Sequence, residues 1–127
     1  MSGAFQPGTH TRGRGRSGED QAVRWLERQG YRILDRNVVN RGGEIDVVAR
    51  DGDTLCFVEI KARGGAAYGA ALAAVTPAKQ RRLARAAALH LALHGLAGPC
   101  RFDVLGLDWT AGGWEYSLVR DAFSVGG

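Results

Sequence analysis

The chain has 127 residues and a formal net charge of +4, with 45% hydrophobic and 24% charged residues. This length and composition are those of one globular domain that can bury a core without disulfides. The sequence has no apolar run of membrane-spanning length, no secretory signal and no Cys/His cluster. It therefore predicts a cytoplasmic protein without a zinc site or redox pair, and its positive charge permits an anionic partner.

The first segment, residues 1–16, is rich in glycine, carries three arginines and no acid, and predicts a flexible basic tail. This tail could contact phosphates or simply aid solubility. The ordered domain is expected over 17–123, beginning with a helix that Ser17 caps and Gly30 ends. Glu19 would lie in the first turn of this helix, where the helix dipole by itself favours an acid.

A charged β-hairpin is expected over residues 42–63, after a first strand at 31–39. Its two apolar runs flank Asp51-Gly52, a strong signal for a two-residue turn. Because side chains alternate along a strand and opposed residues share a face, such a turn places four charged residues on one face. These residues are Glu44, Asp46, Glu59 and Lys61. The opposite face would carry Ile45, Val47, Val58 and Ile60.

Three carboxylates on one hairpin face repel one another, and the single charge of Lys61 cannot balance them. A hard divalent cation with oxygen ligands would neutralise them. Asp46 and Glu59 would be diagonal neighbours at roughly 7–8 Å, within reach of a shared ion. A solvated outer face is the simpler interpretation. However, Phe57 shares the charged face and the other face is apolar, which indicates a sheet covered on both sides.

A second helix is expected from Thr76-Pro77 to about His94, with a stop at Gly95, after an Ala- and Gly-rich loop over residues 64–75. Its first two turns carry basic and amide side chains without an acid: Lys79, Gln80, Arg81, Arg82 and Arg85. Adjacent like charges and a positive helix N-terminus both cost helix stability. A phosphate backbone would relieve both penalties, although a charge run is often only a solvated face.

Two more strands are expected, over Arg101–Trp109 and after the turn at 111–113. The order is then helix, three strands, helix, two strands. This order predicts an α/β fold with a mixed five-stranded sheet flanked by helices.

The motifs, taken in order, resemble those of the YraN-like bacterial family, which has no established activity. The resemblance covers about residues 17–108 and is carried by Gly18-Glu19, Arg36-Asn37, Gly43-Glu44-Ile45-Asp46, Phe57-Val58-Glu59-Ile60-Lys61-Ala62-Arg63, Thr76-Pro77-Ala78-Lys79-Gln80 and Arg101-Phe102-Asp103-Val104. Asp46 followed by Glu59-Ile60-Lys61 is also similar to the PD-(D/E)xK signature of restriction-endonuclease-like nucleases. The resemblance implies a restriction-endonuclease-like core, comparable with that of Holliday junction resolvases.

By this resemblance the protein would be a metal-dependent nuclease, or a nuclease-like protein, acting on structured or branched DNA. The alternative is a catalytically silent DNA-binding or scaffolding protein, and RNA would suit the basic helix equally well. Resolvase-like enzymes are commonly dimers, so the resemblance allows a homodimer. No membrane partner is expected.

The resemblance also implies roles for individual residues. Asp46, Glu59 and the backbone carbonyl of Ile60 would bind Mg2+ or Mn2+, while Glu44 and Glu19 would complete the outer ligand set. Lys61 would orient the attacking water and stabilise developing charge. Gln80 would fix the scissile strand, and neighbouring phosphates would be bound by Arg63, Lys79, Arg81 and Arg82.

Overall fold

The computed structural model describes residues 10–63 and 75–124, with side chains described for 18–61 and 75–124. In chain order the elements are α1 (His10–Arg28), β1 (Arg32–Asn40), β2 (Gly43–Asp51), β3 (Thr54–Arg63), α3 (Pro77–His94), β4 (Cys100–Thr110) and β5 (Gly113–Phe123). The strands form one five-stranded sheet in the order β1-β2-β3-β4-β5. Strands β3 and β4 are parallel and the other neighbouring pairs antiparallel. This mixed sheet confirms the predicted α/β fold.

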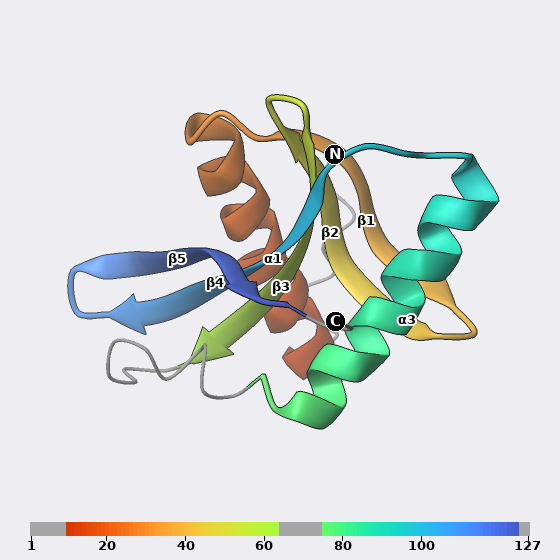
Figure 1. Ribbon diagram of the computed structural model, residues 1–127. Coiled ribbons are helices and arrows are strands. Elements are labelled where there is room, and N and C mark those ends of the chain that lie inside the picture. The colour runs from red at the N-terminus through yellow and green to blue at the C-terminus, as the bar shows by residue number, and fades with distance from the viewer. Residues whose placement is uncertain (1–9, 64–74, 125–127) are drawn as a thin grey trace.

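The two helices cover opposite faces of the sheet (Figure 1). On one face, buried residues of α1 pack with side chains of β2, β3 and β4; this core contains Ala22, Val23, Leu26, Val47, Ala49, Cys56, Val58, Leu105 and Leu107. On the other face α3 packs with β2 and β3; this core contains Ile45, Val48, Leu55, Phe57, Leu83, Ala86 and Ala87. No helix of the described chain is both long enough and apolar enough to cross a membrane.

Helix α1 begins at His10 rather than at the predicted cap, Ser17, so residues expected in the tail are helical. Glu19 consequently lies in the middle of α1 and not in its first turn. The helix dipole acts mainly within the first and last turns, so it does not account for an acid at this position.

The β2–β3 hairpin forms as predicted, but its central turn residues are Gly52 and Asp53, because Asp51 pairs with Thr54. A residue at the first central position of such a turn needs a positive φ, and Gly52 supplies one of 62°. The register therefore differs by two residues from the predicted one. A shift of two preserves the alternation of side chains, so Phe57 still faces the side opposite to Val47 and Val58.

The predicted position of Ile45 is wrong: it packs on the α3 side with Phe57, not on the α1 side with Val47. The alternation of β2 is interrupted at Asp46. Across from Asp46, Asn37 of β1 adopts a left-handed φ of 53°. Regular pairing between β2 and β3 also ends here, so the two strands separate beyond this point.

Helix α3 begins and ends as predicted. The Thr76 hydroxyl accepts a hydrogen bond from the Lys79 backbone N–H at 3.3 Å, and Gly95 terminates the helix with a φ of 61°. Its buried stripe is Leu83, Ala86, Ala87 and His90. Leu93 lies outside this stripe and is 72% exposed.

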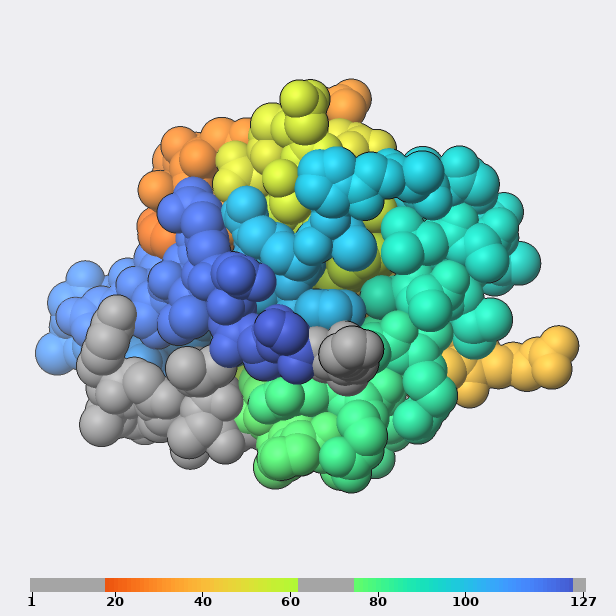
Figure 2. Space-filling view, in the orientation of Figure 1, coloured from red at the N-terminus to blue at the C-terminus, as the bar shows by residue number. Residues whose placement is uncertain are grey.

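The β1–β2 turn projects beside the middle of α3 (Figure 2). The Asn40 side-chain amide donates to the Ala86 carbonyl at 2.9 Å, and its oxygen accepts from the Gly42 backbone N–H at 2.8 Å. A Cβ on Gly42 would lie 2.6 Å from the Ala86 nitrogen, so only glycine fits this contact. The contact holds the start of β2, and with it Glu44, beside α3.

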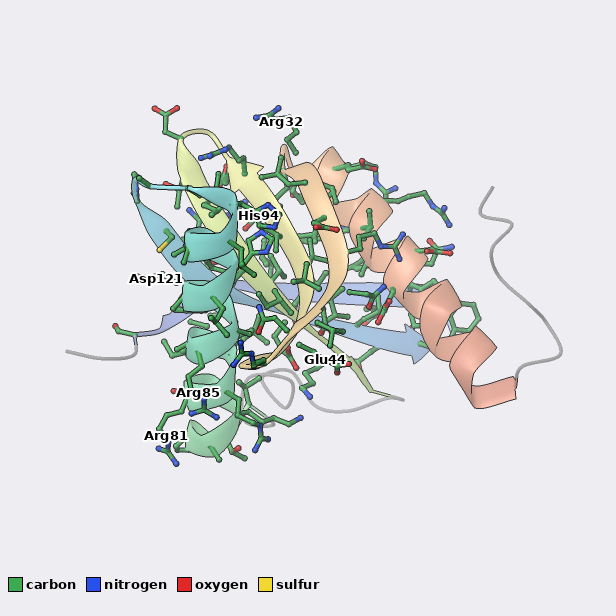
Figure 3. All side chains as sticks on the ribbon, turned by 90° about the vertical axis from the view of Figure 1, so that its right-hand side faces the viewer. Arg32, Glu44, Arg81, Arg85, His94 and Asp121 are labelled. Atoms are coloured by element: carbon green, nitrogen blue, oxygen red, sulfur yellow. The ribbon has the colours of Figure 1, made fainter. Side chains whose placement is uncertain are left out.

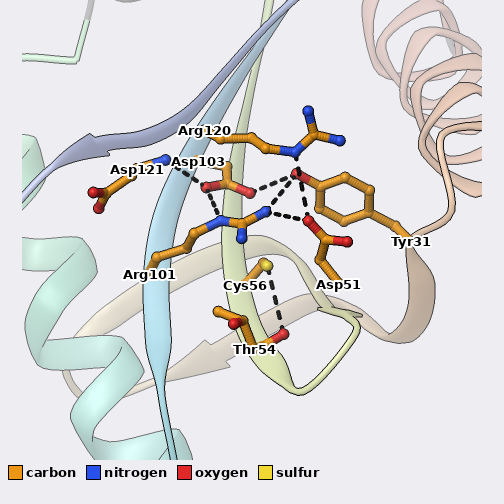
Figure 4. Close-up of polar contacts among 8 residues, drawn as sticks. All are labelled: Tyr31, Asp51, Thr54, Cys56, Arg101, Asp103, Arg120 and Asp121. Carbon is orange, nitrogen blue, oxygen red and sulfur yellow. Dashed lines mark hydrogen bonds and ion pairs between the residues drawn. The ribbon is translucent and has the colours of Figure 1, made fainter.

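A buried polar network lies toward the β2–β3 turn (Figure 4). The fully buried Asp103 carboxylate accepts hydrogen bonds from the Tyr31 hydroxyl at 2.7 Å and from Arg101 Nε at 2.9 Å. Arg101 also donates to Asp51 at 2.6 Å. Burial and the hydrogen bond to Asp103 raise the pKa of Tyr31 to about 12, so it remains a donor. The network joins β2, β4 and the residue that precedes β1, and it gives the Arg101–Val104 motif a structural role.

Candidate active site

A cleft of about 350 Å³ opens at the end of the sheet where β2 and β3 separate. Its walls come from α1, β2, β3 and the first half of α3. The lining residues are Glu19, Gly43, Glu44, Asp46, Glu59, Ile60, Lys61, Val75, Lys79, Arg82 and Leu83. All five residues predicted as catalytic therefore line one cleft, although they come from three separate elements.

Asp46 lies where the strands part. Its Oδ2 accepts a hydrogen bond from the Ile60 backbone N–H at 2.8 Å, so a side chain takes over from the backbone pairing that ends one residue earlier. Burial, and then the negative charge of Glu59, raise the pKa of Asp46 to about 7. Two carboxylates thus share a poorly solvated position without enough positive charge between them.

Glu59 forms an ion pair with Lys61, with 3.3 Å between Oε2 and Nζ, and each side chain is only 18% exposed. The Lys61 amine also lies near the Lys79 amine, and this neighbouring group, followed by burial, lowers the pKa of Lys79. The sequence placed Lys79 on a neighbouring phosphate. In the structure it lines the cleft itself, beside Lys61.

Glu19 reaches the cleft from α1, and its charge also contributes to the raised pKa of Asp46. Arg36 of β1 lies beside this acid: its Nη2 is 4.0 Å from Glu19 Oε1 and donates to Asp20 Oδ1 at 2.7 Å. Arg36 thus ties β1 to α1 next to the cleft. Sequence reasoning gave it no role, although the motif Arg36-Asn37 marked the position.

The basic residues of α3 separate into two groups. Arg82 lines the cleft, whereas Arg81 and Arg85 are exposed and project from α3 on the side away from Glu44 (Figure 3). The Gln80 side-chain amide donates to the Val75 carbonyl at 3.0 Å and so holds the chain that enters α3. The side chain of Arg63 lies outside the described residues, as does the loop predicted over residues 64–75 apart from Val75.

The donor set fits a hard divalent cation that keeps part of its water shell. In the described part of the chain, no three side chains of His, Cys, Asp or Glu gather closely enough to bind a metal by themselves. An ion would therefore rest on Asp46 and Glu59, with water or phosphate oxygens in the remaining positions. Magnesium accepts such a ligand set, and because burial and then the charge of Glu59 raise the pKa of Asp46, a bound cation would stabilise its ionised form.

Comparison with known proteins finds relatives over most of the chain. A family model described as "Uncharacterised protein family UPF0102" matches residues 18–107. A UPF0102 protein of Herminiimonas arsenicoxydans is 45% identical over 106 residues, covering 84% of this chain and 86% of the relative. One from Symbiobacterium thermophilum is 50% identical over 111 residues, covering 86% and 94%. One from Geobacter sulfurreducens is 50% identical over 99 residues, covering 77% of each.

Proposed function

The chain belongs to the uncharacterised protein family UPF0102, and from its cleft we propose that it is a nuclease that depends on Mg2+ or Mn2+ and hydrolyses phosphodiester bonds in structured DNA. One observation carries the proposal. Two half-buried carboxylates, Asp46 and Glu59, face a cleft together with the Lys61 amine, and the pKa of Asp46 is raised to about 7. Perturbed acids in a cleft are typical of catalytic sites.

Asp46, Glu59 and the Ile60 carbonyl would hold the ion, and Glu44 and Glu19 would bind its water shell from opposite walls. When bound, the ion would polarise a phosphoryl oxygen and lower the pKa of the attacking water. The Ile60 N–H fixes the Asp46 carboxylate before any ion arrives. Such preorganisation means that little rearrangement is needed during the reaction.

Lys61 would orient the attacking water and stabilise the negative charge that grows on the phosphate in the transition state. Its ion pair with Glu59 holds the amine next to the carboxylates. Lys79 would bind a second oxygen of the same phosphate. Two neighbouring amines repel each other, and an anion bound between them would turn this repulsion into attraction.

The arginines of α3 would bind phosphates on either side of the reacting one. Arg82 is at the cleft, and Arg81 and Arg85 extend the positive surface along the exposed side of the helix. Such contacts fix the position of a nucleic acid without reading its sequence. Gln80 would fix the scissile strand, and Arg63 would bind a neighbouring phosphate.

A cleavage assay tests the proposal. Purified protein is incubated with labelled duplex, single-stranded and four-way junction DNA in magnesium, in manganese and in chelator. We expect cleavage of at least one substrate that requires the ion and is lost in Asp46→Asn. Binding without cleavage by the wild type would instead support the catalytically silent DNA-binding protein, and absence of binding would reject both functions.

A further inference from the structure

The tip of the β4–β5 hairpin carries an exposed pair of tryptophans. Trp109 is 59% exposed, and its ring meets that of Trp114 edge to face, with centroids 4.9 Å apart and planes at 69°. The two residues pair directly across the hairpin and so share a face of the sheet. We propose that Trp109 is a base-stacking residue that receives an unpaired nucleobase of the nucleic acid bound at the cleft. This inference rests on the proposed function.

The tryptophan pair lies close to the cleft. Strands β3 and β4 are parallel, Lys61 pairs with Gly106, and Trp109 follows three residues later at the same end of the sheet. Because three residues separate Gly106 from Trp109, the Trp109 side chain lies on the α1 face of the sheet, whereas that of Lys61 lies on the α3 face. With about 3.3 Å per residue along a strand and about 4.8 Å between strands, the Cα atoms of Lys61 and Trp109 are roughly 11 Å apart. Stacked nucleotides rise by about 3.4 Å each, so a base that reaches Trp109 around the end of the sheet would be at least about three nucleotides from the reacting phosphate.

A second contact links the pair to the cleft. A Cβ on Gly18 would lie 3.8 Å from Trp114 Cη2, so Trp114 packs against α1 one residue before Glu19. Trp114 also belongs to the core on the α1 side of the sheet. The indole of Trp109 therefore rests on a ring that the fold anchors at the cleft wall.

The turn that carries the pair is also held in place. The Thr110 hydroxyl donates to the Gly113 carbonyl at 2.9 Å and accepts from the Gly112 backbone N–H at 3.2 Å. A ring fixed in this way loses little conformational freedom when a base stacks on it.

The charges around Trp109 favour a base over a phosphate as its ligand. Residues 107–119 contain no lysine or arginine, so the hairpin offers no cation for a phosphate. The charged residues of the hairpin tip are the acids Asp108 and Glu115, which pair across β4 and β5 on the other face and would repel phosphates. An uncharged π-face can bind a base of any sequence. Phosphates would thus be bound along α3, and a base on the hairpin.

The test measures binding in chelator, so that cleavage plays no part. Fluorescence anisotropy compares a labelled single-stranded oligonucleotide with one of equal length and charge built from abasic residues. Trp109→Ala should bind the normal oligonucleotide about tenfold more weakly than wild type does, the scale of one lost base–aromatic stack. Trp109→Phe should retain most of the affinity. Leu93→Ala, which removes another exposed apolar side chain, this one from α3, should change nothing.

Two further readouts separate stacking from other roles. The salt dependence of binding should have the same slope in Trp109→Ala and wild type, since no phosphate contact is lost. The wild type should prefer the normal oligonucleotide to the abasic one more strongly than Trp109→Ala does. A shallower salt slope or an unchanged affinity in Trp109→Ala would overturn the stacking role. Unchanged affinity with weaker self-association would assign Trp109 to a contact between copies of the chain. A wild type that binds no nucleic acid would overturn the proposed function as well.

Discussion

Replacing Asp46 with asparagine removes a negative charge from the cleft and keeps an oxygen that can accept the Ile60 N–H. Burial and the charge of Glu59 raise the pKa of Asp46 from 3.8 to about 7. An acid whose pKa is higher in the folded state makes that state lose stability as the pH rises, here between about 4 and about 7. Above this range the ionised carboxylate lowers the free energy of unfolding by at most ~4 kcal/mol, since each unit of pKa difference corresponds to about 1.36 kcal/mol.

Asp46→Asn should therefore be more stable than wild type at pH 8 and nearly equal to it near pH 4. Chemical denaturation in chelator, repeated at several pH values, measures this difference in the free energy of unfolding. Asp53→Asn makes the same change at an exposed turn residue and should show no comparable gain. Magnesium should then stabilise the wild type but not Asp46→Asn, because only the wild type retains both carboxylates. An Asp46→Asn protein that is less stable than wild type at pH 8 in chelator would refute the reasoning.

Three further predictions concern the cleft, the basic helix and the turn that positions them. Lys61→Ala should leave DNA affinity within about threefold of the wild-type value and lower the cleavage rate by at least ~100-fold. Lys61→Arg should restore little of this rate, because the planar guanidinium does not replace the compact charge of the ammonium group. Equal cleavage by Lys61→Ala and wild type would remove this lysine from the mechanism. Replacing Lys79, Arg81 and Arg82 of α3 with alanine should weaken DNA binding for all sequences. It should also lower the slope of the salt dependence by roughly one for each lost contact. An unchanged slope would show that these side chains form only a solvated face. Gly42→Ala should lower the free energy of unfolding by about 1–3 kcal/mol, because the new Cβ would meet the backbone of α3. Gly112→Ala, whose Cβ would come no closer than 3.9 Å to another residue, is its control, and equal stability of the two variants would contradict the close contact.

Local patterns in the sequence predicted the strands, helix α3 and much of the charged hairpin. Alternation along a strand is a local property, so it placed Glu59 and Lys61 on one face whichever of the two turn registers formed. The caps of α3 are local too, since Thr76 and Gly95 act on backbone groups within a few residues of themselves. The same motifs allowed the predicted family to be recognised, and the family comparison confirms it.

Only the tertiary structure decided how the cleft is assembled. The strands separate at Asp46 because its carboxylate bonds to Ile60 across the hairpin, a contact that no alternation rule predicts. Glu19 reaches the cleft because α1 packs across the face of the sheet opposite to α3. Lys79 meets Lys61 because α3 docks its first turn over the end of β3. Each of these positions depends on packing between elements distant in the chain, where shape and solvent exclusion outweigh the local preferences that a sequence displays.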